Sequence, residues 1–330
     1  MRFDVSYCTV FTYEEPASES QNELRAAPVT NEHQRLIDYR VTVDPPARVL
    51  SYHDAWGTRV DAFGVRKPHT SMEVLAEASV ETSPQPLTAV APRMESLVDA
   101  EFAEDHVAYL FSDEHTDAGP AVRDAAKLQS DLAGDDVVST VLAVHRFVGR
   151  NLTYTPGSTD IGIAVDDVLT SGMGVCQDYS HLAVAMCRSL GIPARYVSGY
   201  LFTEDDSAGA DTSSDTVVVQ THAWFEAAIP GGGWLALDPT NGQNVGERHV
   251  KIGHGRSYDD VQPLRGAFLG PSASAVRASV EIRRTHSHVP ARQTVGAFGP
   301  TELPSDEQLI RAQLQQQTLM QQQQQQQQQQ

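Results

Sequence analysis

The sequence predicts an α+β protein in which an N-terminal antiparallel β domain precedes a mixed part of helices and strands. Up to about residue 82, short runs rich in β-branched and aromatic residues alternate with turn residues. Beyond about residue 90, apolar residues recur with the 3.6-residue period of a helix, and strand patterns return after residue 194. The length of 330 residues is about twice that of a usual domain of roughly 150 residues, which agrees with two domains.

The β domain is expected over residues 1–85. Pro45-Pro46 and Trp56-Gly57-Thr58 supply breaks between its strands, and the segment SPQPLTAVAPR has the composition of a linker. The expected strands are 2–13, 34–43, 49–53, 59–65 and 72–80.

The second domain is expected over residues 86–284, with its central motifs between residues 170 and 270. Its helices are predicted at 136–152, where valines form one stripe, and at 176–190, which Gly191 and Pro193 end. The expected strands are 195–202, 217–229, 234–237 and 275–282.

The C-terminal segment, residues 285–330, ends in a run of glutamines. Such a run has no apolar side chains whose burial would offset the entropy of ordering it, so we expect a disordered glutamine-rich tail. The alternative for part of this segment is a short interaction helix with Leu309, Ile310 and Leu314 as its apolar residues. We assign no chemistry to this segment.

The net charge of the chain argues against some classes of binding partner. Asp and Glu number 43 against 24 Lys and Arg, for a formal net charge of -19, and such a surface disfavours nucleic acid and anionic membrane lipids. Lysine is scarce, and together with the high acidity this indicates adaptation to high salt, although GC-rich coding would also replace lysine by arginine.

The expected compartment is the cytoplasm. Apolar runs stay short of the roughly 18 to 20 residues that span a bilayer, and the N-terminus lacks the layout of a signal peptide. Three cysteines, Cys8, Cys176 and Cys187, are too few and too odd in number for a disulfide framework, so a reducing environment is expected.

Cys176 lies at the start of a predicted helix, after Gly174 and Val175. Unpaired N–H groups and the partial positive charge of a helix N-terminus favour a thiolate and offer donors to an oxyanion. The alternative to a reactive thiol is that Cys176 is a small, buried hydrophobic side chain without chemical function. Cys187 returns to the same face of the helix about 16 Å further on, too far for a disulfide, and is expected in the core.

A predicted hairpin supplies partners for that cysteine. If Ala227 pairs with Gly233 across the intervening loop, His222 lies directly opposite Asp238, close enough for the carboxylate to orient the imidazole. His222 and Trp224 share one face of the strand. The alternative is a surface His–Asp pair without catalytic use.

These segments resemble the bacterial and archaeal transglutaminase-like family, a branch of the papain-like cysteine enzymes. The matching stretches are GVCQDYSHLAVAMCRSLGIPARYVSGYL and THAWFEAAIPGGGWLALDPTNG, while YDDVQPLRGAFLG and VTVDPPARVLSYHDAWGTRV resemble its closing segment and its N-terminal β domain. The resemblance implies that the nucleophile helix packs on an antiparallel sheet. It also implies that Cys176 is the nucleophile, His222 the base and Asp238 the orienting acid.

The implied reaction is acyl transfer through a thioester. We expect hydrolysis of an amide, peptide or isopeptide bond in a peptide or protein substrate. Two alternatives stay open: a protein-glutamine γ-glutamyltransferase, which hands the acyl group to an amine, and a peptide-binding module without catalysis. No cofactor is expected.

Four further assignments accompany this hypothesis. Asp178 is a candidate for substrate binding, with helix capping or pairing with Arg195 as alternatives, and Trp224 is a second candidate. His181 lies about 140° around the helix from Cys176, which argues against its being the base. No metal site is expected, because no C-x-x-C or H-x-x-x-H pair is present.

Overall fold

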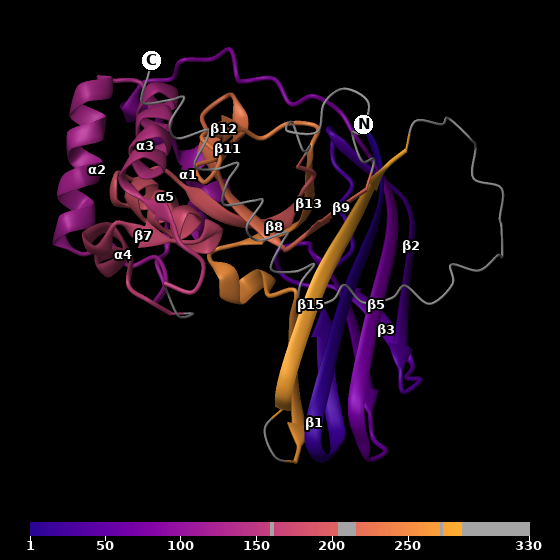
Figure 1. Cartoon of the computed structure of the whole chain (residues 1–330). Coiled ribbons are helices and arrows are strands. Elements are labelled where there is room, and N and C mark those ends of the chain that lie inside the picture. The colour runs from indigo at the N-terminus through magenta and orange to yellow at the C-terminus, as the bar shows by residue number, and fades with distance from the viewer. Residues whose placement is uncertain (159–161, 204–215, 271–272, 286–330) are drawn as a thin grey trace, which may run out of the picture.

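A computed structural model describes residues 1–158, 162–203, 216–270 and 273–285. Figure 1 shows a helical part around a small sheet, beside a part built from long strands. The glutamine-rich tail lies outside the described residues from residue 286 onward.

The large sheet confirms the predicted antiparallel β domain. It orders its strands β2-β5-β1-β15-β9, while β4 and β14 pair with β1 and β3 pairs with β4. Its strands are β1 (Arg2–Leu24), β2 (Gln34–Asp44), β3 (Val49–His53), β4 (Arg59–Val65), β5 (His69–Thr82), β9 (Thr216–Val219), β14 (Leu264–Leu269) and β15 (Ala273–Arg284).

Strand β1 organises this sheet, and it is much longer than the predicted strand 2–13. Its first half pairs with β5 and β15, and its second half pairs with β4 and β14, with register shifts between Thr12 and Ala17. Alternate side chains at its start, Phe3, Val5 and Tyr7, are buried, as expected for a strand with one face on a core.

The strand predicted at 275–282 exists as β15, but it pairs with β1 rather than with the second domain. Strand β14 also pairs with β1. Residues 264–284, which the sequence analysis assigned to the second domain, therefore complete the N-terminal sheet. The hydrophobic pattern predicts a strand but not which of two sheets holds it.

The second part packs helices against a five-stranded antiparallel sheet of order β12-β11-β10-β8-β13. The sheet comprises β8 (Ala194–Leu201), β10 (His222–Ile229), β11 (Gly233–Asp238), β12 (Gln243–Asn244) and β13 (His249–Gly255). The other elements are α1 (Ala100–His106), α2 (Pro120–Ala133), α3 (Val137–Asn151), α4 (Val165–Ser171), α5 (Cys176–Ser189), the pair β6 (Thr153–Tyr154) and β7 (Met173–Gly174), and the 3₁₀ turns η1 (Met94–Val98), η2 (Val107–Leu110) and η3 (Tyr258–Val261).

Both helices predicted in the sequence are present. Asp136 caps α3, because its side chain accepts a hydrogen bond from Ser139 N at 2.6 Å. Helix α5 ends before Gly191, whose φ of 76° is the left-handed conformation expected after a helix. Among the described residues, no helix combines the length and apolar character needed to cross a membrane.

Within the described residues, two large hydrophobic cores and two small clusters are present. The first joins α2, α3 and α5 to one face of the small sheet through Phe225, Ala227 and Leu237. The second belongs to the β domain, yet it includes Tyr200 of β8 and Val250 of β13. The small sheet is therefore packed into the N-terminal domain as well as against the helices.

Gly199 of β8 provides a stability test. A Cβ at this position would lie 2.3 Å from Val250 O and 2.4 Å from Trp224 Cη2. Gly199→Ala is expected to lower the free energy of unfolding in urea by about 1–3 kcal/mol, because a packed side chain and a backbone must both move. The matched control is Gly246→Ala, where a Cβ has no neighbour within 4 Å. Equal stability of the two variants would contradict the packing described.

Candidate active site

The start of α5 fixes Cys176. The preceding strand β7 pairs with β6, so that Tyr154 lies beside Gly174, and Asp178 Oδ2 accepts a hydrogen bond from Val175 N at 2.7 Å. Asp178 is 4% exposed and caps the helix in this way. It does not line the cavity at Cys176, so the structure places it in the capping role rather than in the predicted substrate contact. Its other predicted partner, Arg195, pairs with Glu226 instead.

Cys176 is half-buried and borders a cavity of about 270 Å³. The cavity wall combines the first turn of α5 with β8, the start of β10 and η3. Its residues are Tyr154, Pro156, Gly157, Val175, Cys176, Gln177, Tyr196, Ser198, Gln220, Thr221, His222, Ala223, Tyr258 and Pro263. The sulfur is therefore not enclosed by apolar packing, in contrast to Cys187, which is fully buried and whose thiol pKa burial raises to about 12.

His222 borders the same cavity because the predicted strand 217–229 is interrupted. Its first part is β9, which pairs with β15 in the large sheet, and β10 begins at His222 in the small sheet. Gln220 and Thr221 carry the chain from one sheet to the other. The imidazole thus lies at the end of a strand, next to the open space of the cavity.

His222 Nε2 and Asp238 Oδ2 are 2.8 Å apart, as the sequence analysis expected, but the predicted strand register is wrong. Ile229, not Ala227, pairs with Gly233, because Pro230–Gly232 forms a tight turn in which Gly231 has a φ of 70°. The shift is two residues, which preserves the alternation of faces. Asp238 therefore reaches His222 diagonally rather than from directly opposite.

Asp238 has no exposed surface, and both of its carboxylate oxygens accept hydrogen bonds. Oδ1 accepts from the backbone N–H groups of Thr240 and Asn241 at 3.1 and 3.2 Å. Oδ2 accepts from Asn241 Nδ2 at 2.7 Å and lies 3.2 Å from His249 Nε2, in addition to His222. Burial would raise the pKa of this carboxyl group, but His222 and His249 lower it well below its usual value.

The environment of His222 favours the charged ring. Burial opposes the charge, but Asp238 and, more weakly, Cys176 outweigh it and raise the His222 pKa to about 10. Nδ1 is buried and lacks a partner in good hydrogen-bond geometry among the described residues. One ring nitrogen is thus held by the carboxylate, while the other is left for a group in the cavity.

His249 and Asn241 are residues of this site that sequence reasoning missed. His249 Nδ1 accepts a hydrogen bond from Gly246 N at 3.2 Å, so Nε2 carries the proton that points to Asp238. Burial lowers the pKa of His249, which keeps the ring neutral. Asn241 is part of the D-P-T-N motif, so the motif could have indicated its role. His249 comes from β13, and no local sequence pattern indicates its role.

Trp224 does not line the Cys176 cavity. It is 1% exposed and contacts the ring of His249 edge-on at a centroid distance of 5.3 Å. Its side chain borders a second cavity on the other side of β10. The structure therefore does not place Trp224 at the predicted substrate-binding position beside Cys176.

His181 is excluded as the base, in agreement with the sequence analysis. It is buried, stacks on His115 and accepts a hydrogen bond from Tyr258 N at 3.1 Å. Burial lowers its pKa to about 3, so the ring stays neutral. Its contact with Tyr258 instead fixes η3 at the cavity wall.

Two clusters within the described residues contain metal-ligand atom types. One consists of His222, Asp238 and His249, in which the two imidazole nitrogens already make hydrogen bonds to the same carboxylate oxygen. The other consists of Glu114, His115 and Asp259, and none of these residues lines the cavity at Cys176. Because the Nε2 atom of His249 carries a proton, the first cluster acts as a hydrogen-bond network and does not offer three lone pairs.

Comparison with known proteins defines the class to which this fold and site belong. Residues 125–239 match the transglutaminase-like superfamily, and residues 3–81 match the bacterial transglutaminase-like N-terminal region. The chain belongs to the transglutaminase-like superfamily, and its N-terminal β domain matches the N-terminal region described for bacterial members.

Two similar proteins cover most of the chain, and a third covers a shorter part of it. The protein ML0607 of Mycobacterium leprae is 36% identical over 286 residues, which is 86% of this chain and 99% of that protein. A crystal structure from Cytophaga hutchinsonii, described as a candidate cysteine protease, is similar with a TM-score of 0.63 and 26% identity over 85% of this chain and 90% of that one. A protein-glutamine γ-glutamyltransferase of Pseudomonas aeruginosa is 35% identical over 101 residues, 29% of this chain and 14% of that protein.

The His222–Asp238 pair predicts a measurable titration. Below pH 6.5 the ring is charged in both folded and unfolded chains, and its ion pair stabilises the fold; as the pH rises toward about 10, this contribution is lost. NMR of the histidine ring should therefore show His222 protonated throughout neutral pH. In Cys176→Ala its pKa should fall but stay above 6.5, because Asp238 remains. A ring that titrates near 6.5 in the native chain would contradict the charge pairing.

Proposed function

We propose that the protein is a thiol-dependent acyltransferase that uses water as its usual acceptor, with Cys176 as nucleophile, His222 as acid and base, and Asp238 as the orienting group. The observation that carries this proposal is the state of His222. Its Nε2 is tied to a buried carboxylate, its Nδ1 has no strong partner among the described residues, and it borders one cavity together with a half-buried thiol.

The chemistry follows from that arrangement. The Cys176 sulfur attacks the carbonyl carbon of an amide, and the N–H groups at the start of α5, that of Cys176 among them, stabilise the oxyanion. The charged His222 gives its Nδ1 proton to the leaving nitrogen as the C–N bond breaks, which leaves a thioester. The neutral His222 then takes a proton from water as the water oxygen attacks the thioester carbon, and the C–S bond breaks to release the acid and the Cys176 thiolate beside a charged His222.

Hydrolysis is favoured over transfer to an amine by the extent of the comparisons. The likeness to the Cytophaga structure, described as a candidate cysteine protease, extends over nearly both chains, whereas the likeness to the γ-glutamyltransferase is confined to 14% of that protein. The substrate class we propose is a peptide or protein amide. Its reactive part must be narrow, because the cavity at the sulfur is small.

Selective alkylation tests the nucleophile. Cys8 and Cys187 are buried, and burial raises their thiol pKa values to about 11 and about 12, so iodoacetamide should modify Cys176 in the folded protein. At pH 6 the reaction should be faster than with free cysteine, and His222→Ala should slow it on the order of tenfold or more, because the charged imidazole that borders the same cavity is removed. Mass spectrometry identifies the modified residue.

The controls separate a catalytic thiol from an exposed one. Cys176→Ala should take up no label, and His106→Ala, at the end of α1, should label like the native chain. If Cys176 reacts no faster than free cysteine, the binding-module alternative is favoured over the enzyme.

The pH dependence tests the role of Asp238. In the native chain, hydrolysis should decline on the alkaline side near pH 10, where His222 loses its proton. Asp238→Asn removes the charge that raises the His222 pKa and leaves the burial that lowers it, so the decline should move to about pH 6.5 or below. The rate at neutral pH should fall about 10²–10⁴-fold. If the alkaline limit is the same in Asp238→Asn as in the native chain, His222 is not the acid of the reaction.

The acceptor is tested with a fluorescent primary amine and a glutamine-containing protein. Hydrolysis predicts release of ammonia or a cleaved peptide without fluorescent label on the protein, whereas transfer predicts covalent labelling. Both products should be absent with Cys176→Ala. Labelling that exceeds hydrolysis would replace water by an amine as the usual acceptor.

A further inference from the structure

A second and larger cavity, of about 530 Å³, lies on the other face of the small sheet. Ala223 of β10 borders the Cys176 cavity, whereas Trp224 and Glu226, whose side chains alternate with it, border the second one. Among the described residues, the two cavities have no lining residue in common. The opposite wall comes from the N-terminal domain and from the segment after β5, including Gln34 and Leu87.

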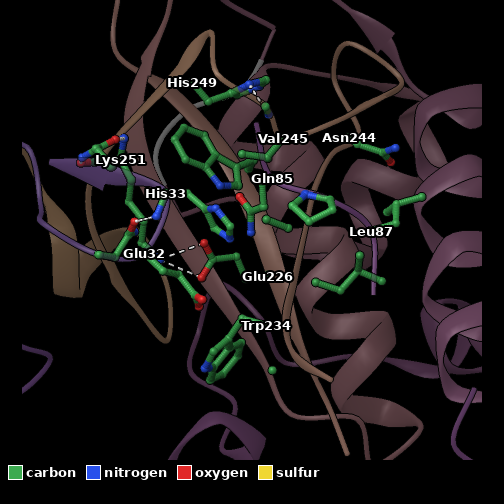
Figure 2. A pocket seen from close by; sticks show the side chains of 18 of the residues that line it. Glu32, His33, Gln85, Leu87, Glu226, Trp234, Asn244, Val245, His249 and Lys251 are labelled. Atoms are coloured by element: carbon green, nitrogen blue, oxygen red, sulfur yellow. Dashed lines mark hydrogen bonds and ion pairs between the residues drawn. The ribbon is translucent and has the colours of Figure 1, made fainter. Parts of the chain in front are cut away.

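Buried charges form the floor of this cavity. Figure 2 shows Glu226 joined to Lys251 across it, with Trp234, His33 and Gln85 nearby. Lys251 Nζ lies 2.8 and 2.7 Å from the two Glu226 oxygens, and Arg195 Nε lies 2.6 Å from Oε2. Two cations thus face one carboxylate. Burial and, more weakly, Arg195 lower the Lys251 pKa to about 8, while Glu226 opposes this shift.

Trp224 adds an unused donor. Its side chain is 1% exposed, and its Nε1 has no hydrogen-bond partner among the described residues. The benzo edge of the ring lies against β8, where Cη2 and Cζ3 occupy the space that a Cβ of Gly199 would need. A buried N–H without an acceptor is costly, and a ligand in the cavity that Trp224 borders would supply one.

The rest of the wall limits the ligand. Pro86, Leu87, Val245 and Trp234 give it apolar surface, and the guanidinium of Arg195 lies 3.6 Å from the ring centroid of Trp234. The floor has an excess of one positive charge, while Glu32 at the wall and the net charge of -19 oppose a multiply charged anion.

We propose that this cavity is a binding site for a small monocarboxylate with an apolar body. The carboxylate lies at Lys251 and Arg195, an oxygen of the ligand accepts the Trp224 Nε1 proton, and the apolar part rests on Trp234 and Leu87. This cavity does not include Cys176, although His249, which contacts Asp238, also borders it. Binding here does not require the thiol chemistry proposed above.

The test uses the full chain and two probes that differ in one group, N-acetyl-leucine and its uncharged amide, with calorimetry as the measurement. N-acetyl-leucine should bind saturably with one site per chain, and the amide at least about tenfold more weakly. Trp224→Phe keeps an aromatic side chain but removes the N–H donor, and it should weaken binding of N-acetyl-leucine about tenfold.

Two variants locate the binding. Leu87→Trp fills the cavity from its exposed side and should abolish binding, whereas Leu132→Trp, on the exposed surface of α2, should leave it unchanged. Cys176→Ala should also bind normally. Equal affinity for acid and amide, no saturable binding at about 10 mM, native affinity in Leu87→Trp, or loss of binding in Cys176→Ala would each overturn the proposal.

Discussion

The buried carboxylate of Asp238 is the interaction on which the site depends. A fully buried charge is tolerated only when its oxygens are saturated with hydrogen bonds and an opposite charge lies close by. Here the turn after β11 supplies two backbone donors, Asn241 supplies an amide, and two imidazoles from β10 and β13 supply the rest. The same contacts that satisfy the carboxylate therefore fix the ring of His222 in orientation and keep it charged.

This network also couples parts of the sheet that are remote in sequence. His145 of α3 lies 3.0 Å from the backbone oxygen of Asp238 through its Nε2, so the helical layer is tied to the end of β11 as well. Helix α5 brings Cys176 to the neighbouring cavity wall. The geometry of the site consequently rests on the helices α3 and α5 as well as on the small sheet, and not on the hairpin alone.

Local patterns in the sequence were sufficient for much of this arrangement. The helices α3 and α5, the capping of α5 by Asp178, the strands of the β domain and the closeness of His222 and Asp238 all follow from turn chemistry, periodicity and alternation. The hairpin register was wrong by two residues, because the loop length depends on which glycines adopt positive φ, and composition does not specify that. The closeness of His and Asp survived this error because an even shift preserves the faces of the strand.

Local sequence patterns did not predict the pairing of strands that are far apart in the sequence. Nothing near β15 indicates that it returns to β1, and His249 reaches Asp238 only because β13 lies beside β8. The role of Trp224 was misjudged for a related reason, since a shared strand face with His222 does not determine which cavity a side chain borders. Contacts between distant segments depend on the packing of whole sheets, and a single sequence carries little record of it.

The junction between the two sheets bears on how such a protein can be divided. Strand β13 is an edge strand, and at Lys251 its outward backbone groups bond to the side-chain amide of Gln34, at 2.8 Å from Lys251 N and 2.7 Å from its oxygen. One amide side chain thus imitates a neighbouring strand and blocks an otherwise open edge. A fragment that began after the linker would lose the hydrogen bonds of Gln34 and the apolar partners of Tyr200 and Val250. The unpaired edge of β13 would then be free to pair with strands of other copies and to promote aggregation. The two regions therefore depend on each other for the satisfaction of this edge and for part of the hydrophobic core.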